Sequence, residues 1–145
     1  MFHKEGHKII VLFLSITIID ILIVDDDPCL VEFYKIGLKK NGYKTTVYND
    51  SPQALKAFLN NPYDFDVVFT DQTMPGLTGS ELSKKILHIR PDIPIIIATG
   101  YSHSLSKEQA LSLGIKAFLQ KPIKLQELIP TIQNFINKNK AWYVF

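Results

Sequence analysis

Short apolar runs alternate with longer helix-like segments along most of this 145-residue chain. The runs are residues 21–24, 45–48, 67–70, 93–98 and 115–119. At least two of them are almost purely apolar, which is typical of strands that helices cover on both faces. Strands that alternate with helices pair in parallel through right-handed crossovers. The sequence therefore predicts an α/β fold, in which five helices cover both faces of one five-stranded, parallel, doubly wound sheet.

Capping residues mark the ends of the first three helices. Asp27–Pro28 and Ser51–Pro52 each place a capping side chain directly before a proline, which favours the first helical position. Asn41–Gly42 ends the first helix. Thr78 and Glu81 have the spacing of a capping box, so we expect the third helix to begin at Thr78.

The last two helices have weaker boundary signals. We expect the fourth helix to run from near Ser104 to Gly114, and the fifth to carry the apolar stripe of residues 125–136. Pro130 lies inside this stripe, and it predicts either a kink or a later start for the fifth helix.

Polar residues cluster where the predicted strands end. Sheets of this type bind ligands outside the carboxyl ends of their strands. The residues directly after the first, third, fourth and fifth runs are Asp25, Asp26, Asp27, Asp71, Thr99, Gly100, Gln120, Lys121 and Pro122. Neighbouring carboxylates repel one another unless a cation is present. Their hard oxygen atoms suit Mg²⁺ or Mn²⁺.

This charge pattern predicts a site for a phosphoryl group. Lys121 and a divalent ion together would leave excess positive charge, which an anion such as a phosphoryl group balances. A carboxylate can accept that group as an aspartyl phosphate. Asp71 is the best candidate, because it stands alone at the end of the predicted central strand. Asp25 and Asp26 can hold the metal, and the loop after Asp71 can turn the Thr73 carbonyl toward it.

Four segments resemble the motifs of response regulator receiver domains, the phosphorylation switches of two-component signalling. They are residues 21–27, 70–76, 97–100 and 119–122. The resemblance covers roughly residues 20–138 and is to single-domain receivers like the chemotaxis regulators. It implies a flavodoxin-like sheet with strand order 2-1-3-4-5.

The resemblance also implies a role for each site residue. Asp71 matches the phospho-accepting aspartate, and Asp25 with Asp26 matches the acidic metal pair. Thr73 matches the residue whose main-chain carbonyl completes the Mg²⁺ site. The phosphoryl donor would be a sensor histidine kinase or a histidine phosphotransfer protein. Such a domain is not an enzyme for an external substrate, although it catalyses its own phosphoryl uptake and slow loss.

Three further residues match the switch. Thr99 and Lys121 match the residues that contact the phosphoryl group, and Phe118 holds the aromatic switch position, where tyrosine is common. Phosphorylation would draw Thr99 and Lys121 inward and change the face formed by the fourth helix, the fifth strand and the fifth helix. A protein partner, or a second copy in a dimer, is expected on that face. Tyr101 is expected to shape solvent access to the phosphoryl group.

Two alternatives compete with this interpretation. An aspartyl-phosphate phosphatase usually needs a second aspartate two residues after its nucleophile, where this chain has Thr73. A receiver-like binding module that is never phosphorylated is expected to lose acidic residues, and none of the expected ones is missing here.

The charge and cysteine content of the chain exclude some kinds of partner and some kinds of site. The 16 Lys and Arg residues against 14 Asp and Glu residues give a net charge of +2, which is too small to indicate direct nucleic acid binding. The single cysteine, Cys29, excludes an internal disulfide and a cysteine-rich zinc site. Because a kinase that uses ATP would phosphorylate this chain, we expect it in the cytoplasm.

The chain divides into an apolar N-terminal extension (1–19), a receiver domain (20–138) and a short tail (139–145). The apolar part of the extension is shorter than the roughly 20 residues that span a bilayer. We expect a packing or dimerising segment, a peripheral membrane contact, or translation from an upstream start. The receiver domain leaves no room for a DNA-binding or enzymatic output domain, so the output is a protein contact or the chain is a piece of a longer regulator.

Overall fold

The structure, a computed structural model, describes residues 18–100 and 105–140. Five parallel strands form one sheet in the order β2-β1-β3-β4-β5. The strands are β1 (Asp20–Val24), β2 (Lys44–Tyr48), β3 (Val67–Asp71), β4 (Ile95–Thr99) and β5 (Ala117–Gln120). This topology confirms the predicted flavodoxin-like fold.

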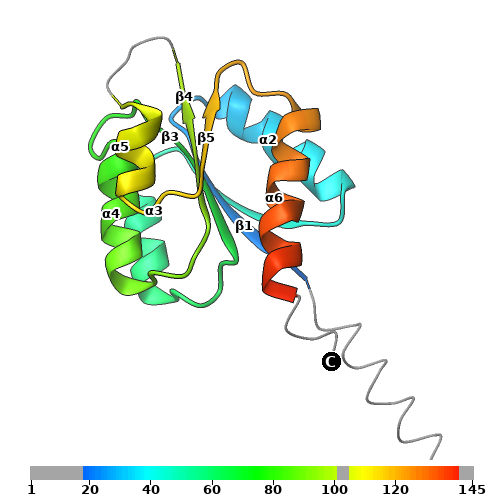
Figure 1. Ribbon diagram of the computed structural model, residues 1–145. Coiled ribbons are helices and arrows are strands. Elements are labelled where there is room, and N and C mark those ends of the chain that lie inside the picture. The colour runs from blue at the N-terminus through cyan, green and yellow to red at the C-terminus, as the bar shows by residue number, and fades with distance from the viewer. Residues whose placement is uncertain (1–17, 101–104, 141–145) are drawn as a thin grey trace, which may run out of the picture.

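Helices cover both faces of the sheet. They are α2 (Pro28–Lys40), α3 (Ser51–Asn60), α4 (Gly79–Ile89), α5 (Lys107–Ser112) and α6 (Leu125–Lys140). Figure 1 shows α2 and α6 on one face, and α3, α4 and α5 on the other. The molecule therefore has three layers, with the sheet in the middle.

Burial on both faces explains the apolar strands. Every residue of β1 and β3 is buried. Side chains of β1 alternate between two core clusters, so that Ile21 and Ile23 pack with Tyr34 of α2, whereas Leu22 packs with Phe58 of α3. The two edge strands, β2 and β5, contain no fully buried residue.

The helix caps correct one prediction. Asp27 caps α2 as predicted, and Thr78 caps α4. The cap of α3 is Asp50, not Ser51, because the Asp50 side chain accepts a hydrogen bond from the Gln53 N–H. Ser51 is instead the first residue of this helix.

Several other boundaries differ from the sequence-based expectation. β4 begins two residues later than its apolar run, after Pro94, which has no N–H to donate. β5 also begins later, because the Ile115 N–H bonds to Ala110 in the turn after α5. α5 begins at Lys107, with Ser106 as its cap, and not near Ser104. α6 begins at Leu125 and continues through its internal proline, so its start is not delayed.

The N-terminal extension meets the domain at Ile18 and Ile19. Ile18 is 67% exposed. Ile19 packs against the core cluster beside α2 and α6, and its carbonyl accepts a hydrogen bond from the Lys44 N–H. The rest of the extension and residues 141–145 lie outside the described residues. Within the described part, no helix is both long enough and apolar enough to cross a membrane.

Candidate functional site

Three carboxylates meet at the carboxyl edge of the sheet. Asp25 follows β1, Asp26 comes next, and Asp71 ends the neighbouring strand β3. One oxygen atom from each carboxylate lies within 4.8 Å of the other two. Asp25 and Asp71 are buried, whereas Asp26 is exposed. The fold thus brings together acidic side chains that are far apart in the sequence.

Lys121 reaches this cluster from the loop after β5. Its Nζ atom lies 3.0 Å from Asp71 Oδ1 and 3.3 Å from Asp25 Oδ2. The Lys121 N–H donates to the Thr99 carbonyl at 2.7 Å, which fixes the start of this loop beside β4. The lysine side chain is 25% exposed, so it remains within reach of an incoming ligand.

The charges of the cluster do not balance. Three ionised carboxylates against one ammonium group leave two negative charges. Burial raises the pKa of both Asp25 and Asp71, and the hydrogen bonds that each carboxylate accepts oppose this effect only in part. Burial alone would lower the pKa of Lys121, but its bonds and charge interactions with the two aspartates outweigh burial and raise it. A dication at the carboxylates would restore neutrality.

Thr99 lies at the end of β4, beside the carboxylates. It is 4% exposed, and it follows Ala98, the residue that pairs with Asp71. Within residues 18–100 and 105–140, its hydroxyl donates a long hydrogen bond of 3.3 Å to the Gly100 carbonyl. The hydroxyl therefore lies at the carboxyl edge of the sheet, beside β3 and its terminal Asp71.

Phe118 lies further back on β5. It is partly buried and packs against the core cluster beneath α3, α4 and α5. It pairs with Ile97, a residue of the same cluster. Strand side chains alternate between faces, so Thr99 lies on the same face as Ile97, two residues before it. Because Phe118 pairs with Ile97, Thr99 and Phe118 lie on the same face of the sheet. Tyr101, the predicted solvent gate, lies outside the described residues.

Thr73 is exposed in the loop between β3 and α4, directly after the buried end of β3. Gln72 fixes the start of this loop. Its side-chain oxygen accepts a hydrogen bond from the Ser80 N–H at 2.8 Å, and its carbonyl accepts one from the Gly79 N–H at 2.9 Å. The structure thus joins the loop that carries Thr73 to the first turn of α4.

Gly79 permits this close approach. A Cβ atom at position 79 would lie 2.2 Å from the backbone oxygen of Asp71, closer than any real contact. Sequence reasoning did not identify Gln72 or Gly79 as site residues. The available signals were a buried-strand end followed by a glutamine, and a glycine directly after the Thr78 cap.

Asp27 and Cys29 contribute to the helix that begins beside the site. The Asp27 N–H donates to Asp25 Oδ1 at 2.9 Å, and its side chain accepts from the Cys29 N–H at 2.9 Å. Asp27 therefore caps α2 and also orients the Asp25 carboxylate. Cys29 is an exposed residue of this helix.

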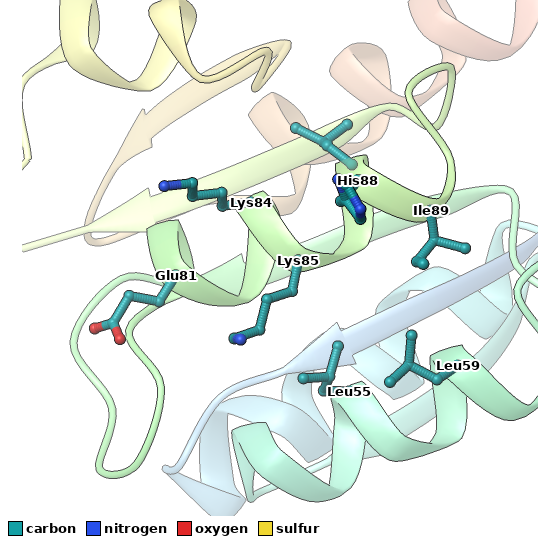
Figure 2. A pocket seen from close by; sticks show the side chains of 8 residues that line it. Leu55, Leu59, Glu81, Lys84, Lys85, His88 and Ile89 are labelled. Atoms are coloured by element: carbon teal, nitrogen blue, oxygen red, sulfur yellow. The ribbon is translucent and has the colours of Figure 1, made fainter.

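A groove on another surface contains none of the predicted site residues. It lies between α3 and α4, and Figure 2 shows Leu55 and Leu59 of α3 opposite Lys85 and Ile89 of α4. Glu81 is the one acidic residue among the described residues that line this groove, so the groove has no cluster of carboxylates. The predicted site residues lie at the edge of the sheet and do not line this groove.

Comparison with curated proteins identifies relatives of this chain. It is 31% identical over 118 residues to the sensory transduction protein RegX3 of Mycolicibacterium smegmatis, which covers 81% of this chain and 50% of RegX3. The chain spans about half the length of these curated relatives.

Two solved structures agree with this chain in fold over nearly their full length. A response regulator receiver domain protein from Clostridium thermocellum superimposes with a TM-score of 0.81 at 31% identity, covering 86% of this chain and 99% of that structure. The response regulator TrrA of Thermotoga maritima, solved in complex with Mg²⁺ and BeF, has a TM-score of 0.73 at 30% identity, covering 81% of this chain and 99% of TrrA.

The family assignment covers most of the described structure. Residues 21–133 match the response regulator receiver domain family, from the first residues of β1 into α6. The acidic cluster, the lysine after β5 and the strand order all lie within this range. This chain belongs to the response regulator receiver domain family.

Proposed function

We propose that this chain is a signalling switch that accepts a phosphoryl group on Asp71. One observation carries the proposal. The buried Asp71 carboxylate lies 3.0 Å from the Lys121 ammonium group and shares an edge of the sheet with two further carboxylates. Membership of the receiver family supports the same role.

The residues present fit a hard divalent cation. We assign Asp25, Asp26, Asp71 and the Thr73 carbonyl as the groups that hold Mg²⁺, with Mn²⁺ as the closest substitute. The excess negative charge of the cluster and the raised pKa of its two buried carboxyls favour a dication there. When bound, the ion would screen the acidic cluster from an incoming phosphoryl group. The complex of TrrA with Mg²⁺ and BeF supports this assignment.

The reaction is a transfer from phospho-histidine to a carboxylate. An oxygen of Asp71 attacks the phosphorus atom, the phosphorus–nitrogen bond breaks, and the histidine leaves as a neutral imidazole after taking up a proton. Lys121 neutralises charge on the phosphoryl oxygens, and the Thr99 hydroxyl at the end of β4 donates a hydrogen bond to one of them. No external substrate is consumed, and later loss of the phosphoryl group to water resets the switch.

The partners follow from this chemistry. The donor is a sensor histidine kinase or a histidine phosphotransfer protein, which places the chain in the cytoplasm with the ATP that such a kinase uses. The output surface is the face formed by α5, β5 and α6, the fourth helix, fifth strand and fifth helix of the domain. The half-exposed Leu111 of α5 and the partly buried Phe118 of β5 support this surface as a contact for a protein partner or a second copy.

The alternatives have less support. A phosphatase of this type would need an acid at position 73, where the exposed residue is a threonine. A module that is never phosphorylated would not need a lysine held between two buried carboxylates.

Intact mass spectrometry tests the proposal. The full chain is incubated with acetyl phosphate, with and without Mg²⁺, beside the Asp71→Asn variant. We expect one phosphoryl adduct that requires Mg²⁺ and is absent from the variant. An adduct of equal yield in Asp71→Asn would overturn the site assignment, and no adduct in the wild type would overturn the function.

A further inference from the structure

Ser51 makes a set of contacts that its position in α3 does not explain. The Asp50 side chain already caps this helix, so the Ser51 hydroxyl is not needed there. Ser51 is nevertheless 1% exposed. Its Oγ atom accepts a hydrogen bond from the Leu77 N–H at 2.9 Å. It also lies 2.8 Å from the Leu77 carbonyl and 3.1 Å from the Pro75 carbonyl, to one of which it donates at a time.

These contacts reach the loop that carries Thr73. The glycine at position 76 has a φ of +83°, and a Cβ there would lie 3.0 Å from Pro52 Cγ. The loop backbone therefore packs directly against the first turn of α3. Met74 is buried in the same core cluster as Ala54 of α3. Helix α3 thus contacts the part of the loop that follows Thr73 in the sequence, whereas Asp71 precedes it.

Each end of the loop has a separate anchor. Gln72 ties the start of the loop to β4 and to the first turn of α4. Among the described residues, Ser51 supplies the hydrogen bonds that tie Pro75 and Leu77 to the rest of the protein. A carbonyl at Thr73 can be presented in one direction only if the backbone on both sides of it is fixed.

We propose that Ser51 is a positioning residue for the metal and phosphoryl site. Its hydroxyl holds residues 75–77, and through them it sets the direction of the Thr73 carbonyl. This inference rests on the proposed function, because it assumes that Mg²⁺ binds at Asp25, Asp26 and Asp71. It adds a residue from the first turn of α3, outside the carboxylate cluster, to the groups that position the site.

An NMR titration of the full chain with Mg²⁺ tests the inference. We compare Ser51→Ala with Asp50→Ala, which removes the cap of the same helix but leaves the loop contacts intact. The Ser51→Ala variant should raise the Kd for Mg²⁺ about three- to tenfold, because the loss of the net contribution of one hydrogen bond weakens an affinity by about that factor. Asp50→Ala should lower the unfolding midpoint without changing the Kd, and Asp50→Asn controls for the lost charge.

Hydrogen exchange of the Leu77 amide gives a second readout that needs no metal. Ser51→Ala should speed this exchange relative to the wild type, whereas Asp50→Ala should not, because the amide bonds to the Ser51 hydroxyl. Should Ser51→Ala fail to fold, Ser51→Cys keeps the size of the side chain with weaker hydrogen bonding, and an intermediate rise in Kd is expected.

The outcomes separate this inference from the proposed function. The positioning role is overturned if Ser51→Ala or Ser51→Cys binds Mg²⁺ with the same Kd as the wild type. In that case the proposed function still stands, provided that Asp71→Asn abolishes Mg²⁺ binding. An equal rise in Kd for Asp50→Ala and Ser51→Ala also overturns it, because general destabilisation would then explain both. A wild-type chain in which Mg²⁺ binding does not depend on Asp71 overturns both proposals.

Discussion

Lys121 is the residue on which the charge balance of the site depends. It is paired with Asp71 at 3.0 Å and with Asp25 at 3.3 Å, and both carboxylates are buried. The raised pKa of Lys121 keeps its ammonium group charged throughout the neutral range. In the proposed reaction, the lysine supplies a fixed positive charge where negative charge develops during phosphoryl transfer.

The Lys121→Met variant tests this role. It keeps the length of the side chain but removes the charge, so the rate of phosphoryl uptake from acetyl phosphate at saturating Mg²⁺ should fall roughly 100-fold. The measurement is the initial rate of adduct formation by intact mass, with the exposed Lys124→Met as the matched control. A wild-type rate in Lys121→Met would contradict the assigned role.

The raised pKa of Asp25 and Asp71 predicts a pH dependence of metal binding. Burial is the main cause of both shifts, so without metal these carboxyls hold protons above the ordinary aspartate pKa of 3.8. The affinity for Mg²⁺ should therefore weaken as the pH falls through the raised values, and metal binding should release protons. Without metal, the free energy of unfolding should fall as the pH rises through this window, because the folded state loses protons that the unfolded state has already lost.

Calorimetry at a series of pH values measures both effects, with buffers of different ionisation enthalpy to count the released protons. Asp20→Asn is the control, because Asp20 is also buried with a raised pKa but lies at the opposite end of β1. This variant should leave the pH dependence of the Mg²⁺ affinity unchanged. A Kd that does not vary with pH below neutrality would contradict the ionisation account.

At the scale of the elements, the contact between β3 and α4 determines the position of Asp71, the proposed phosphoryl acceptor. The backbone oxygen of Asp71 faces Gly79 so closely that only a residue without a Cβ fits there. The Gly79 N–H also donates to the Gln72 carbonyl at 2.9 Å. The first turn of α4 thus rests directly on the end of β3.

Replacing this glycine tests the contact. Gly79→Ala should lower the free energy of unfolding by about 1–3 kcal/mol, because backbone atoms must shift to admit the methyl group. Urea denaturation measures this change, and the phosphoryl adduct should form more slowly as Asp71 moves. Gly100→Ala is the control for the unfolding measurement, because a Cβ there meets no atom of the described residues within 4 Å. Equal stability of the two variants would contradict the close contact.

The sequence predicted the fold and the clustered site residues because both follow from local patterns. Apolar runs identify buried strands, and the ends of parallel strands meet at one edge. The cap of α3 was assigned to Ser51 instead of Asp50 because adjacent Asp and Ser residues both favour that position. Ser51 itself bonds to a loop 26 residues away, and no local pattern reports such a contact.

At the scale of the whole molecule, the boundary of the N-terminal extension is open to test. Ile19 packs against the core and its carbonyl accepts a hydrogen bond from the Lys44 N–H, so this last residue of the extension belongs to the packed domain. We propose that the residues before it are an addition to the receiver domain: a packing or dimerising segment, a peripheral membrane contact, or the product of translation from an upstream start.

Two deletions locate the boundary. Removal of residues 1–17 should leave the unfolding free energy and the adduct yield unchanged, because the contacts of Ile19 remain. Removal of residues 1–19 should cost about 1–2 kcal/mol through the lost apolar packing. Size-exclusion chromatography and urea denaturation provide the readouts. If removal of residues 1–17 changes the oligomeric state, the expectation of an unchanged protein is wrong, and the dimerising role of the extension is supported.

The central claim is that Asp71 carries the phosphoryl group, and borohydride reduction tests it most directly. This reagent reduces an acyl phosphate on aspartate to homoserine, which peptide mass spectrometry locates by residue. After treatment with acetyl phosphate and Mg²⁺, we predict homoserine at position 71 and nowhere else in the chain. Homoserine at position 25 or 26, or a phosphoryl adduct that yields no homoserine, would contradict the account.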